Sequence, residues 1–423
     1  MSTTIQAIRG INDILPETIH RWQQLEAHLQ DWLAAWGYRE IRTPIVEQVS
    51  LFKRAIGEVT DIVEKEMYAF QDSLNGELLA LRPEGTAACV RAVIQHNLLY
   101  NGPQRLWYAG PMFRHERPQK GRYRQFHQFG VESLGYADPD MDAEHIVMTA
   151  DLWQRLQLTG IQLEINSLGD SAARNRYRNR LIGWFEQHAD LLDEDARRRL
   201  HSNPLRILDS KNPAMQAMIE AAPKLADDLD EQALAHFETV QKITTRQGVQ
   251  FRVNPRLVRG LDYYNYTVFE WISDQLGAQS TVCAGGRYDG LIEQIGGKPA
   301  PACGFAIGIE RLLDILEASQ QTETPASPDV YLVHAGETAS VMAWDIARQL
   351  RAAGLQVIRH CGGGSFKSQM KKADSSQARY ACIMGDDEAA AGTLTLKPLR
   401  SGEAQITLPL GDAIARLTQE ETR

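Results

Sequence analysis

The chain has 423 residues, of which 43% are hydrophobic and 23% are charged. This composition is typical of a globular protein, and the length exceeds that of a single core, so two or three domains are expected. A net charge of −9 argues against a general affinity for nucleic acid. No run of eighteen apolar residues occurs, so no membrane-spanning helix is expected.

Cysteine usage indicates the cellular compartment, and the charge distribution indicates where an RNA could bind. Five cysteines without C-x-x-C spacing indicate a reducing compartment, and the first ten residues lack an apolar secretory core, so a cytoplasmic location is expected. Residues 1–330 carry 34 Lys and Arg against 44 Asp and Glu, whereas residues 331–423 carry 11 against 10. In the second part, Arg359–Arg379 holds five basic residues against Asp374 alone. An RNA partner is therefore expected to bind at local patches.

The first predicted elements are a helix and a strand. Apolar residues recur at steps of three and four from Pro16 to Trp36, with Gly37 directly after them, which predicts an amphipathic helix. Tyr38–Val46 follows as a predicted strand. Pro44 has no N–H to donate there, which favours a sheet edge. That edge is either a contact with a second subunit or a simple sheet margin.

A strand-to-helix junction follows near residue 84. Leu78–Leu81 is an apolar strand, and a helix is predicted from Thr86 onward. Glu84 and Thr86 lie where the strand ends and the helix begins, a common place for side chains that face a ligand. The alternative is an ordinary helix cap, because Thr and Glu are frequent in first turns.

The most informative stretch is a long hairpin with a basic tip. Arg105–Phe113 and Gln125–Glu132 both read as strands, and Pro118 and Gly121 punctuate the segment between them. Five fixed positive charges fall within 114–124, which predicts a phosphate-binding loop, because the arginine fork can grip phosphate oxygens in pairs.

The second strand of this hairpin supports a ligand site. Phe126, Gln128, Gly130 and Glu132 share one face of the strand, so an aromatic ring, an amide and a carboxylate lie beside the arginines. A carboxylate there can accept hydrogen bonds from a substrate ammonium or ring N–H. The alternative is a solvated basic loop on an edge hairpin.

The next segments change character twice. Residues 171 to about 250 are rich in charged residues and Ala with helical spacing, which predicts a helical insertion. Leu257–Glu270 reads as a strand with three tyrosines behind Arg259 and Gly260. Such an aromatic run is typical of a core strand, but an arginine beside a backbone-permissive glycine favours a site.

Two glycine-containing segments close the first part of the chain. Thr281–Gly290 is a strand that runs into a glycine turn. This turn either lets a ligand approach the backbone closely or is a plain hairpin turn. Cys303–Leu313 pairs a strand of small residues with a helix that begins near Arg311. We expect the small residues Gly304, Ala306 and Gly308 to leave room above the sheet for a flat base.

A linker and a second domain follow. Residues 321–329 are polar and include two prolines, which predicts a linker. Beyond them, three short apolar strands alternate with two helices through 384. This order predicts a small α/β domain with a mostly parallel sheet.

Taken in order, these pieces resemble the histidyl-tRNA synthetase family of class II aminoacyl-tRNA synthetases over nearly the whole chain. The three class motifs are similar to Arg9–Pro16 with the strand ending at Pro44, to Phe113–Glu116 with its loop, and to Gly304–Arg311. Leu257–Tyr264 and Ala284–Asp289 narrow the match, because they resemble the histidine-specific signatures.

The resemblance implies an α+β class II synthetase catalytic domain, residues 1–320, whose six-stranded antiparallel sheet is flanked by helices. The insertion at 171–250 would lie over the acceptor arm of tRNA. Residues 321–329 would link this domain to a C-terminal α/β anticodon-binding domain at 330–423. The first of the three class motifs, which forms the dimer contact in this family, further implies a homodimer.

The implied activity is that of a histidine–tRNA ligase. Such an enzyme uses ATP, bound with Mg²⁺, to activate L-histidine as histidyl-adenylate. It then transfers the histidyl group to the 3′ end of tRNA(His). We assign no protein side chain to a metal. The implied catalytic residues are Arg114 and Arg259. Implied histidine-binding residues are Glu84, Thr86, Arg114, Gln128, Glu132, Arg259, Tyr263, Tyr264 and Tyr288. Implied ATP-binding residues are Arg114, Glu116, Arg122, Phe126 and Arg311. Implied tRNA-binding residues are Arg117, Gln119, Lys120, Lys371 and Lys372.

A rival interpretation is a catalytically silent paralogue that resembles the regulatory subunit of ATP phosphoribosyltransferase. Such a protein is expected to lack the C-terminal domain and to have lost site arginines. This chain keeps the final domain together with Arg114, Arg259 and Arg311, which favours the enzyme. A generic RNA-binding module is disfavoured by the acidic main body.

Overall fold

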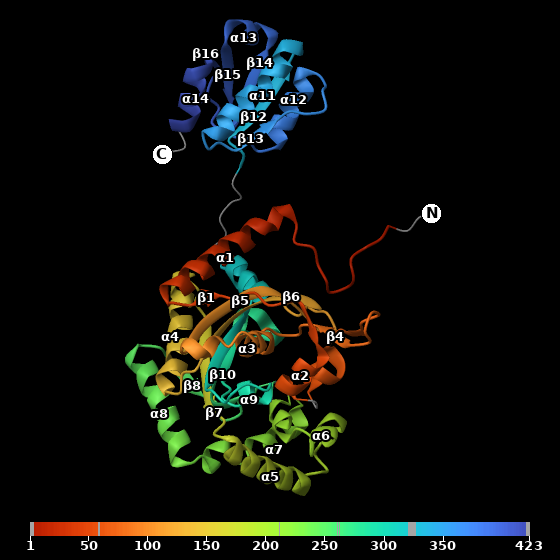
Figure 1. The fold of residues 1–423 in the computed structure, drawn as a ribbon, viewed down its shortest axis with the longest axis vertical. Helices are drawn as coiled ribbons and strands as arrows, with labels where there is room; N and C mark the ends of the chain where they lie inside the picture. Colours follow the sequence, from red (N-terminus) through yellow and green to blue (C-terminus); the bar gives the residue numbers. More distant parts are fainter. Residues whose placement is uncertain are drawn as a thin grey trace. The chain divides into compact units, whose positions relative to one another are not determined.

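The computed structural model describes residues 4–57, 60–210, 212–259, 261, 263–319 and 327–419 (Figure 1). The chain divides into two compact units, Met1–Glu323 and Thr324–Arg423. Of the expected linker 321–329, residues 321–326 lie outside the described residues. Every helix in the described part of the chain is too short or too polar to cross a lipid bilayer.

The first unit is built on an eight-stranded sheet in the order β1-β5-β6-β11-β10-β9-β7-β8. The six middle strands pair antiparallel, as expected, but β1 and β8 add parallel pairings at the two margins. The expected six strands therefore correspond to the middle of the sheet, and the two marginal strands, β1 and β8, were not expected. The strands are β1 (Arg39–Glu40), β5 (Gln104–Phe113), β6 (Gln125–Leu134), β7 (Ile161–Ser167), β8 (Phe251–Val253), β9 (Asn265–Ser273), β10 (Thr281–Arg287) and β11 (Ala302–Gly308).

Helices cover both faces of this sheet because successive side chains of each strand point to opposite faces. One face packs on α1, α4, α8 and α10, where Trp107 and Phe129 belong to the same apolar cluster as Leu29 and Trp32. The other face packs on α2, α3 and α9 and is continuous with the core of the insertion. These helices are α1 (Pro16–Ala35), α2 (Val49–Ile56), α3 (Thr86–Gln95), α4 (Pro139–Arg155), α8 (Glu231–Arg246), α9 (Leu291–Gln294) and α10 (Ile309–Ala318). Short turns η2 (Leu98–Asn101) and η6 (Asp274–Gln279) join strands to their neighbours.

The predicted strand Tyr38–Val46 is wrong as a single element. The structure splits it into β1 at the margin of the large sheet and β2 (Val46–Gln48), which belongs to a three-stranded sheet in the order β2-β4-β3. Pro44 lies between the two, where its missing N–H interrupts neither ladder. The partners of β2 are β3 (Ala69–Gln71) and β4 (Leu78–Leu81), which leads to α3 as expected, and η1 (Ile62–Glu66) precedes β3.

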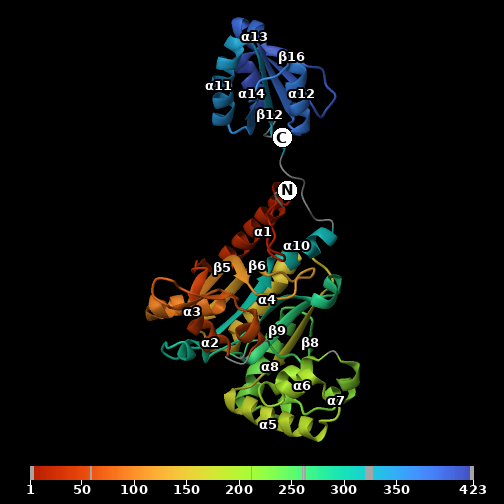
Figure 2. The same cartoon turned by 90° about the vertical axis from the view of Figure 1, so that its right-hand side faces the viewer.

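The stretch from 171 to 250 is helical as predicted, but its helices pack in two different places. Helices α5 to α7 form a separate cluster at the end of the sheet opposite α1 (Figures 1 and 2). Helix α8 instead packs on the sheet beside α4, with Val240 fully buried. The elements of the cluster are α5 (Ser171–Gln187), α6 (Glu194–Arg199), η3 (Pro204–Asp209), η4 (Pro213–Met215), α7 (Gln216–Glu220) and η5 (Leu225–Asp228).

The second unit is a five-stranded α/β sheet in the order β13-β12-β14-β15-β16. The three predicted strands pair parallel, whereas β15 and β16 extend the sheet antiparallel. The strands are β12 (Val330–Ala335), β13 (Val357–Arg359), β14 (Tyr380–Gly385), β15 (Thr393–Pro398) and β16 (Ile406–Pro409). The helices are α11 (Glu337–Ala352), α12 (Phe366–Ser375), α13 (Asp386–Ala391) and α14 (Leu410–Gln419).

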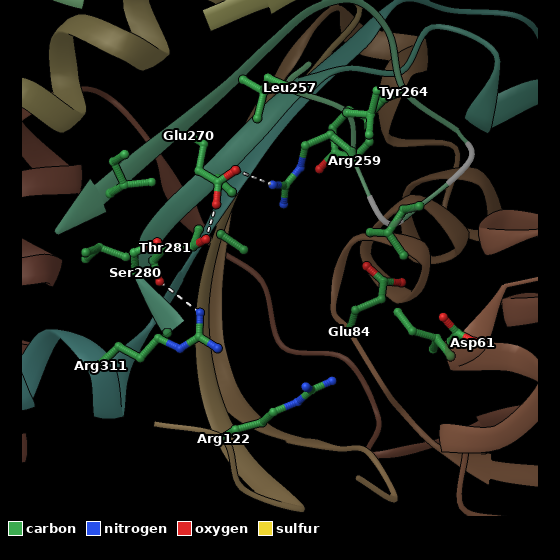
Figure 3. A pocket seen from close by; sticks show the side chains of 18 of the residues that line it. Asp61, Glu84, Arg122, Leu257, Arg259, Tyr264, Glu270, Ser280, Thr281 and Arg311 are labelled. Atoms are coloured by element: carbon green, nitrogen blue, oxygen red, sulfur yellow. Dashed lines mark hydrogen bonds and ion pairs between the residues drawn. The ribbon is translucent and has the colours of Figure 1, made fainter. Parts of the chain in front are cut away.

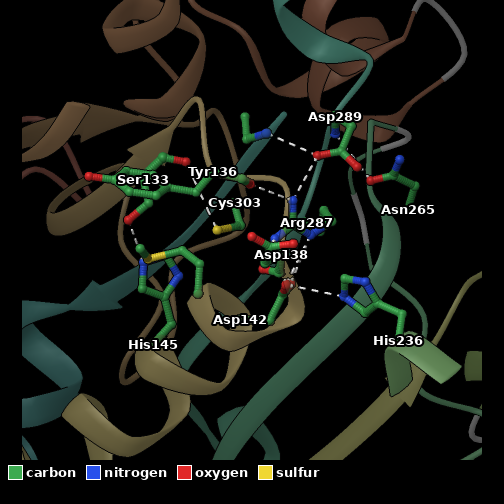
Figure 4. A network of polar contacts seen from close by, with 12 residues as sticks. Ser133, Tyr136, Asp138, Asp142, His145, His236, Asn265, Arg287, Asp289 and Cys303 are labelled. Atoms are coloured by element: carbon green, nitrogen blue, oxygen red, sulfur yellow. Dashed lines mark hydrogen bonds and ion pairs between the residues drawn. The ribbon is translucent and has the colours of Figure 1, made fainter. Parts of the chain in front are cut away.

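A buried ion pair ties the first unit together behind the sheet (Figure 4). Arg287, at the end of β10, donates from Nε and Nη2 to the Asp142 carboxylate of α4 at 2.6 to 3.2 Å, and both side chains are 1% exposed. Its remaining donors reach Asp289 and two backbone carbonyls, so no donor of the guanidinium is left over. His236 of α8 also contacts Asp142, at 3.2 Å. Burial by itself raises the pKa of Asp142, but the His236 hydrogen bond and the Arg287 charge hold it below its ordinary value.

We expect Asp142→Asn to lower the free energy of unfolding of the first unit by about 3 to 5 kcal/mol, because Arg287 would keep a buried charge without its partner. The control is Glu317→Gln, which breaks the exposed pair with Arg21 (61% and 32% exposed) and should cost less than about 1 kcal/mol. Urea unfolding followed by tryptophan fluorescence measures both. Equal shifts of the two midpoints would contradict the assignment.

Candidate active site

A single cavity of about 1160 Å³ lies over one face of the large sheet (Figure 3). Its wall comes from the β4–α3 junction, the β5–β6 hairpin, the segment before β9, strands β9 to β11, the start of α10 and the inner side of the insertion. This volume exceeds the usual range for one drug-sized ligand. Elements far apart in sequence therefore form one chamber with room for two reactants.

Most of the predicted site residues line this cavity. They are Glu84, Thr86, Arg114, Glu116, Arg122, Phe126, Gln128, Arg259, Tyr263, Tyr264 and Arg311. Glu132 and Tyr288 lie beneath the lining, each 1% exposed. Arg117, Gln119 and Lys120 are exposed on the loop between β5 and β6, outside the lining. Lys371 and Lys372 are exposed on α12 of the second unit.

Arg114 stands where β5 ends. Its Nε donates to the Pro83 carbonyl at 2.9 Å, and its guanidinium covers one face of the Phe126 ring, 5.1 Å from the ring centroid. Burial lowers the pKa of Arg114, although the negative charges of Glu66 and Glu84 oppose this shift. The side chain is thus held rigidly between a carbonyl and a ring, and its charge is poorly hydrated. Such a charge attracts an incoming anion strongly.

Arg259 faces the same cavity from the segment before β9. Its Nη1 contacts the Glu270 carboxylate at 3.4 Å, and its guanidinium lies over the Tyr264 ring. Burial by itself lowers the pKa of Arg259, but the charge of Glu270 and the neighbouring Tyr264 and Tyr263 hydroxyls together raise it. Gly260, which follows Arg259, lies outside the described residues.

Arg311 and Arg122 complete the positive wall. Arg311 donates from Nε to the Gly121 carbonyl at 3.0 Å and from Nη1 to the Thr281 carbonyl at 2.8 Å, so it joins the basic loop to β10. Its pKa is lowered by burial and by the nearby charges of Arg114 and Arg122. Arg122 is paired with Glu116.

The loop that carries these arginines is braced from behind. The backbone N–H groups of Arg124 and Gln125 both donate to the Gly10 carbonyl, at 2.7 and 3.2 Å. Gly10 has φ of +86°, and a Cβ there would lie 2.7 Å from Pro118. The N-terminal segment therefore needs glycine to approach the loop this closely. This contact explains why the Arg9-Gly10 pair accompanies the basic hairpin.

Glu84 combines both roles that the sequence left open. Its carboxylate accepts the backbone N–H groups of Thr86 and Ala87 at 2.7 and 2.9 Å, so it caps the first turn of α3. It also lines the cavity, only 3% exposed. Burial raises its pKa, and the two backbone hydrogen bonds oppose that shift. A carboxylate held in place by a helix start is a firm acceptor for an ammonium group.

Three tyrosines and Glu132 make the floor at this end. The Tyr263 ring lies 4.7 Å from that of Tyr264 and 5.4 Å from that of Tyr288. The Glu132 carboxylate accepts the hydroxyl of Tyr108 at 3.0 Å and that of Tyr288. Burial raises the pKa of Glu132 to about 8, against the effect of these hydrogen bonds.

Gly304 corrects the expectation of room above β11. A Cβ on Gly304 would lie 2.0 Å from a Glu132 oxygen and 2.6 Å from the Tyr288 hydroxyl, so protein side chains already fill that space. Ala306 and Gly308, further along the strand, do line the cavity. Room for a flat base therefore exists only over the second half of β11, next to Arg311.

The predicted strand Leu257–Glu270 is wrong in its first half, because β9 begins only at Asn265. At Tyr266 the backbone has φ of +44°, and its N–H and carbonyl bond to Gly169 and Leu168. Residues before β9 are thereby released from the ladder and turned toward the cavity. Their β-branched and aromatic composition is typical of a strand, but tertiary contacts decide otherwise.

Sequence reasoning missed Glu270, which lines the cavity between Arg259 and Thr281. Its carboxylate accepts the Thr281 hydroxyl and contacts Arg259. The available signal was an acidic residue within the otherwise apolar run from Val268 to Trp271. Within the described residues, no group of three or more His, Cys, Asp or Glu side chains is arranged to hold a metal ion.

Comparison with known proteins decides the family. The model of the family described as histidyl-tRNA synthetase matches residues 10–312, and that of the anticodon binding domain matches residues 329–420. The chain is 65% identical over 417 residues to the histidine–tRNA ligase of Thiobacillus denitrificans, covering 99% of both chains. The chain belongs to the histidyl-tRNA synthetase family. The corresponding ligase of Nitrosomonas europaea is 62% identical, again over 99% of each chain.

Solved structures agree with this placement. The apo histidyl-tRNA synthetase of S. aureus superposes with a TM-score of 0.82 at 36% identity, covering 98% of this chain and all of that one. This synthetase therefore has the expected class II catalytic domain and anticodon-binding domain, and the expectation of a histidine–tRNA ligase is confirmed. A Bacillus halodurans chain titled ATP phosphoribosyltransferase regulatory subunit/histidyl-tRNA synthetase shares the fold at 23% identity and a TM-score of 0.65. The silent-paralogue interpretation is not favoured.

The raised pKa of Glu132 predicts a specific pH dependence of stability. Between the ordinary value of 4.5 and about 8, the folded protein keeps a proton that the unfolded chain has released. The free energy of unfolding should then fall as pH rises, by up to about 1.4 kcal/mol per pH unit. Glu132→Gln removes this contribution, so its stability relative to wild type should improve between pH 5.5 and 7.5. Urea unfolding at both pH values measures this; parallel pH profiles would contradict it.

Proposed function

We propose that the two reactions of this histidine–tRNA ligase take place in the cavity described above. In the first, a carboxylate oxygen of L-histidine attacks the α-phosphorus of ATP, forming histidyl-adenylate and releasing pyrophosphate. In the second, the 3′-terminal hydroxyl of tRNA(His) attacks the histidyl carbonyl carbon and AMP leaves. Both steps need alignment and neutralisation of negative charge more than covalent help from the protein.

The convergence of Arg114, Arg122, Arg259 and Arg311 on one cavity carries this proposal. Arg114 and Arg259 flank the α-phosphate and stabilise the charge that develops there. Arg122 and Arg311 hold the outer phosphates. The free face of Phe126 stacks on adenine, since Arg114 covers the other face. Glu116 is paired with Arg122. When the ATP phosphates replace Glu116 as the partner of Arg122, Glu116 contacts the nucleotide.

The opposite end of the cavity receives histidine. Glu84, Thr86 and Gln128 bind the ammonium end, and Arg114 and Arg259 contact the carboxylate. Tyr264 and Glu132 read the imidazole, with Tyr263 and Tyr288 completing the wall. Amino acids without ring N–H groups would leave these buried acceptors unpaired, which disfavours them by about 10⁴. No separate editing activity is then required.

Magnesium enters as part of the ATP substrate. ATP phosphates supply most of its ligands, because Mg²⁺ keeps several waters and uses few carboxylates in such sites. Glu270, which lines the cavity, contacts Arg259, and its negative charge keeps Arg259 oriented before substrates arrive.

Two exposed basic surfaces are proposed to contact tRNA. Arg117, Gln119 and Lys120 extend from the loop between β5 and β6, next to the cavity entrance. Lys371 and Lys372 lie on the exposed side of α12 in the anticodon-binding domain. Both are local patches on a chain of net negative charge, which keeps non-specific RNA binding weak.

We further propose a homodimer that acts in the cytoplasm, where tRNA is charged. Support for the dimer comes from apolar side chains left exposed near the N-terminus and the β1–β2 connection: Ile5 is 97% exposed and Ile8 63%, while Ile45 and Val46 are above 40%. Exposed apolar side chains of this kind are typical of a subunit contact.

We expect Arg259→Ala to slow histidine-dependent ATP–pyrophosphate exchange by roughly 10² to 10³, the scale for one preorganised charge stabiliser. Histidine binding, measured by calorimetry, should persist. Arg155→Ala, a surface arginine of α4 paired with Asp151, is the matched control and should leave exchange unchanged. An unaltered exchange rate in the Arg259 variant would refute its role. Running the assay with each of the twenty amino acids tests substrate identity.

Replacing Lys371 and Lys372 together by alanine should weaken tRNA(His) binding and flatten its dependence on salt, because fewer counterions are released. Pyrophosphate exchange, which needs no tRNA, serves as the internal control. Filter binding between 50 and about 200 mM salt measures both affinity and slope. If affinity and slope stay at wild-type values, α12 does not contact tRNA.

A further inference from the structure

The hydroxyl of Tyr108 lies between two of the groups proposed to recognise histidine. Tyr108 belongs to β5 and is 2% exposed. Its hydroxyl donates to Oε1 of Glu132 at 3.0 Å and lies 3.4 Å from the hydroxyl of Thr86. Thr86 belongs to the end that receives the ammonium group, and Glu132 belongs to the end that reads the imidazole. One buried phenol therefore contacts both ends of the amino-acid pocket, yet no step of the proposed reactions uses it.

Two glycines make the space for the Tyr108 ring. Gly130 pairs directly with Tyr108 across β5 and β6, and a Cβ on Gly130 would lie 2.2 Å from the ring. A Cβ on Gly85, the residue before α3, would lie 2.0 Å from the ring. On its strand, Gly130 stands between Gln128 and Glu132, whose side chains point to the same face. The Tyr108 ring fills this gap in the row, because two neighbouring positions carry no side chain.

The protons of the two hydroxyls fix the direction of these contacts. A hydroxyl has one proton to donate and two lone pairs that accept. Because Tyr108 donates to Glu132, Thr86 donates to Tyr108 in the second contact. The lone pairs of Thr86, which lines the cavity, then remain for a ligand. Burial and the charges of Glu132 and Glu84 raise the pKa of Tyr108 well above its ordinary value, so its proton stays in place.

We propose that Tyr108 is a positioning residue that couples recognition of the histidine ammonium group at Thr86 to recognition of the imidazole at Glu132. This role of Tyr108 rests on the proposed function, since it requires histidine in the cavity. An ammonium group that donates to Thr86 strengthens the bond from Thr86 to Tyr108 and, through it, the bond from Tyr108 to Glu132, because hydrogen bonds in a chain polarise one another. The contact of 3.4 Å is long for two hydroxyls and shortens when the ligand binds.

Tyr108→Phe tests the coupling, because it keeps the ring between the two glycines and removes only the hydroxyl. In histidine-dependent ATP–pyrophosphate exchange, KM for histidine should rise about tenfold, the scale of one hydrogen bond, while kcat and KM for ATP stay near wild type. Imidazolepropionate, which is histidine without its amino group, is then used as a competitive inhibitor. The preference for histidine over imidazolepropionate should be at least about threefold smaller in the variant than in wild type, the size of a coupling between interacting groups.

Tyr177→Phe is the matched control. Tyr177 is also 2% exposed, and its hydroxyl donates to the Pro223 carbonyl at 3.0 Å, outside the cavity lining. This control should leave both readouts unchanged. Thr86→Ala probes the other end of the chain of hydroxyls and also serves if Tyr108→Phe fails to fold. It should weaken binding of imidazolepropionate, which has no amino group, by about threefold, whereas Thr86→Ser keeps the hydroxyl and should not.

Three results would overturn the proposal. The first is an unchanged KM for histidine in Tyr108→Phe. The second is an equal preference for histidine over imidazolepropionate in wild type and variant, since the hydroxyl would then support the fold without linking the two ends. The third is a loss of kcat and of ATP affinity as large as the loss for histidine. If wild type fails to activate histidine at all, the proposed function is refuted instead.

Discussion

The structure depends on holding several like charges together in one partly buried cavity. Arg114, Arg122, Arg259 and Arg311 repel one another there, and the pKa of Arg311 is lowered partly for this reason. Each of these charges has a nearby partner that reduces the repulsion. The carbonyl of Pro83 accepts a hydrogen bond from Arg114, and those of Gly121 and Thr281 accept hydrogen bonds from Arg311. The carboxylates of Glu116 and Glu270 form ion pairs with Arg122 and Arg259. Charges that are already positioned cost little reorganisation when phosphates arrive.

The same constraint explains the division of the cavity. Two further acidic groups, Glu84 and Glu132, lie at the end proposed to bind the amino acid, where backbone N–H groups satisfy Glu84 and hydroxyls satisfy Glu132. Behind that end, the buried pair of Arg287 and Asp142 joins the strand that carries Tyr288 to the helix beneath it. The positive end is left open toward the insertion. One chamber can thus bind a zwitterionic amino acid and a triphosphate without mutual interference.

Sequence reasoning performed well where interactions are local. The β5–β6 hairpin, α1 and the Glu84 junction follow from periodicity and turn residues within a few positions of each other, and the resemblance to a known family carried the roles. It failed where distant chain segments decide. The segment before β9 has strand composition, yet contacts of Tyr266 with the β7–α5 turn take it out of the ladder. Gly304 suggested open space that Glu132 and Tyr288 fill.

By itself, then, the sequence determined the kinds of chemistry present: arginines for phosphate, carboxylates and tyrosines for an amino acid, and two domains in a fixed order. Only the tertiary structure decided which groups meet. Glu270 balances Arg259 and Asp142 satisfies Arg287, and neither pairing is visible in spacing. The physical reason is that residue type sets what a side chain can bind, whereas strand pairing across hundreds of residues sets its neighbours.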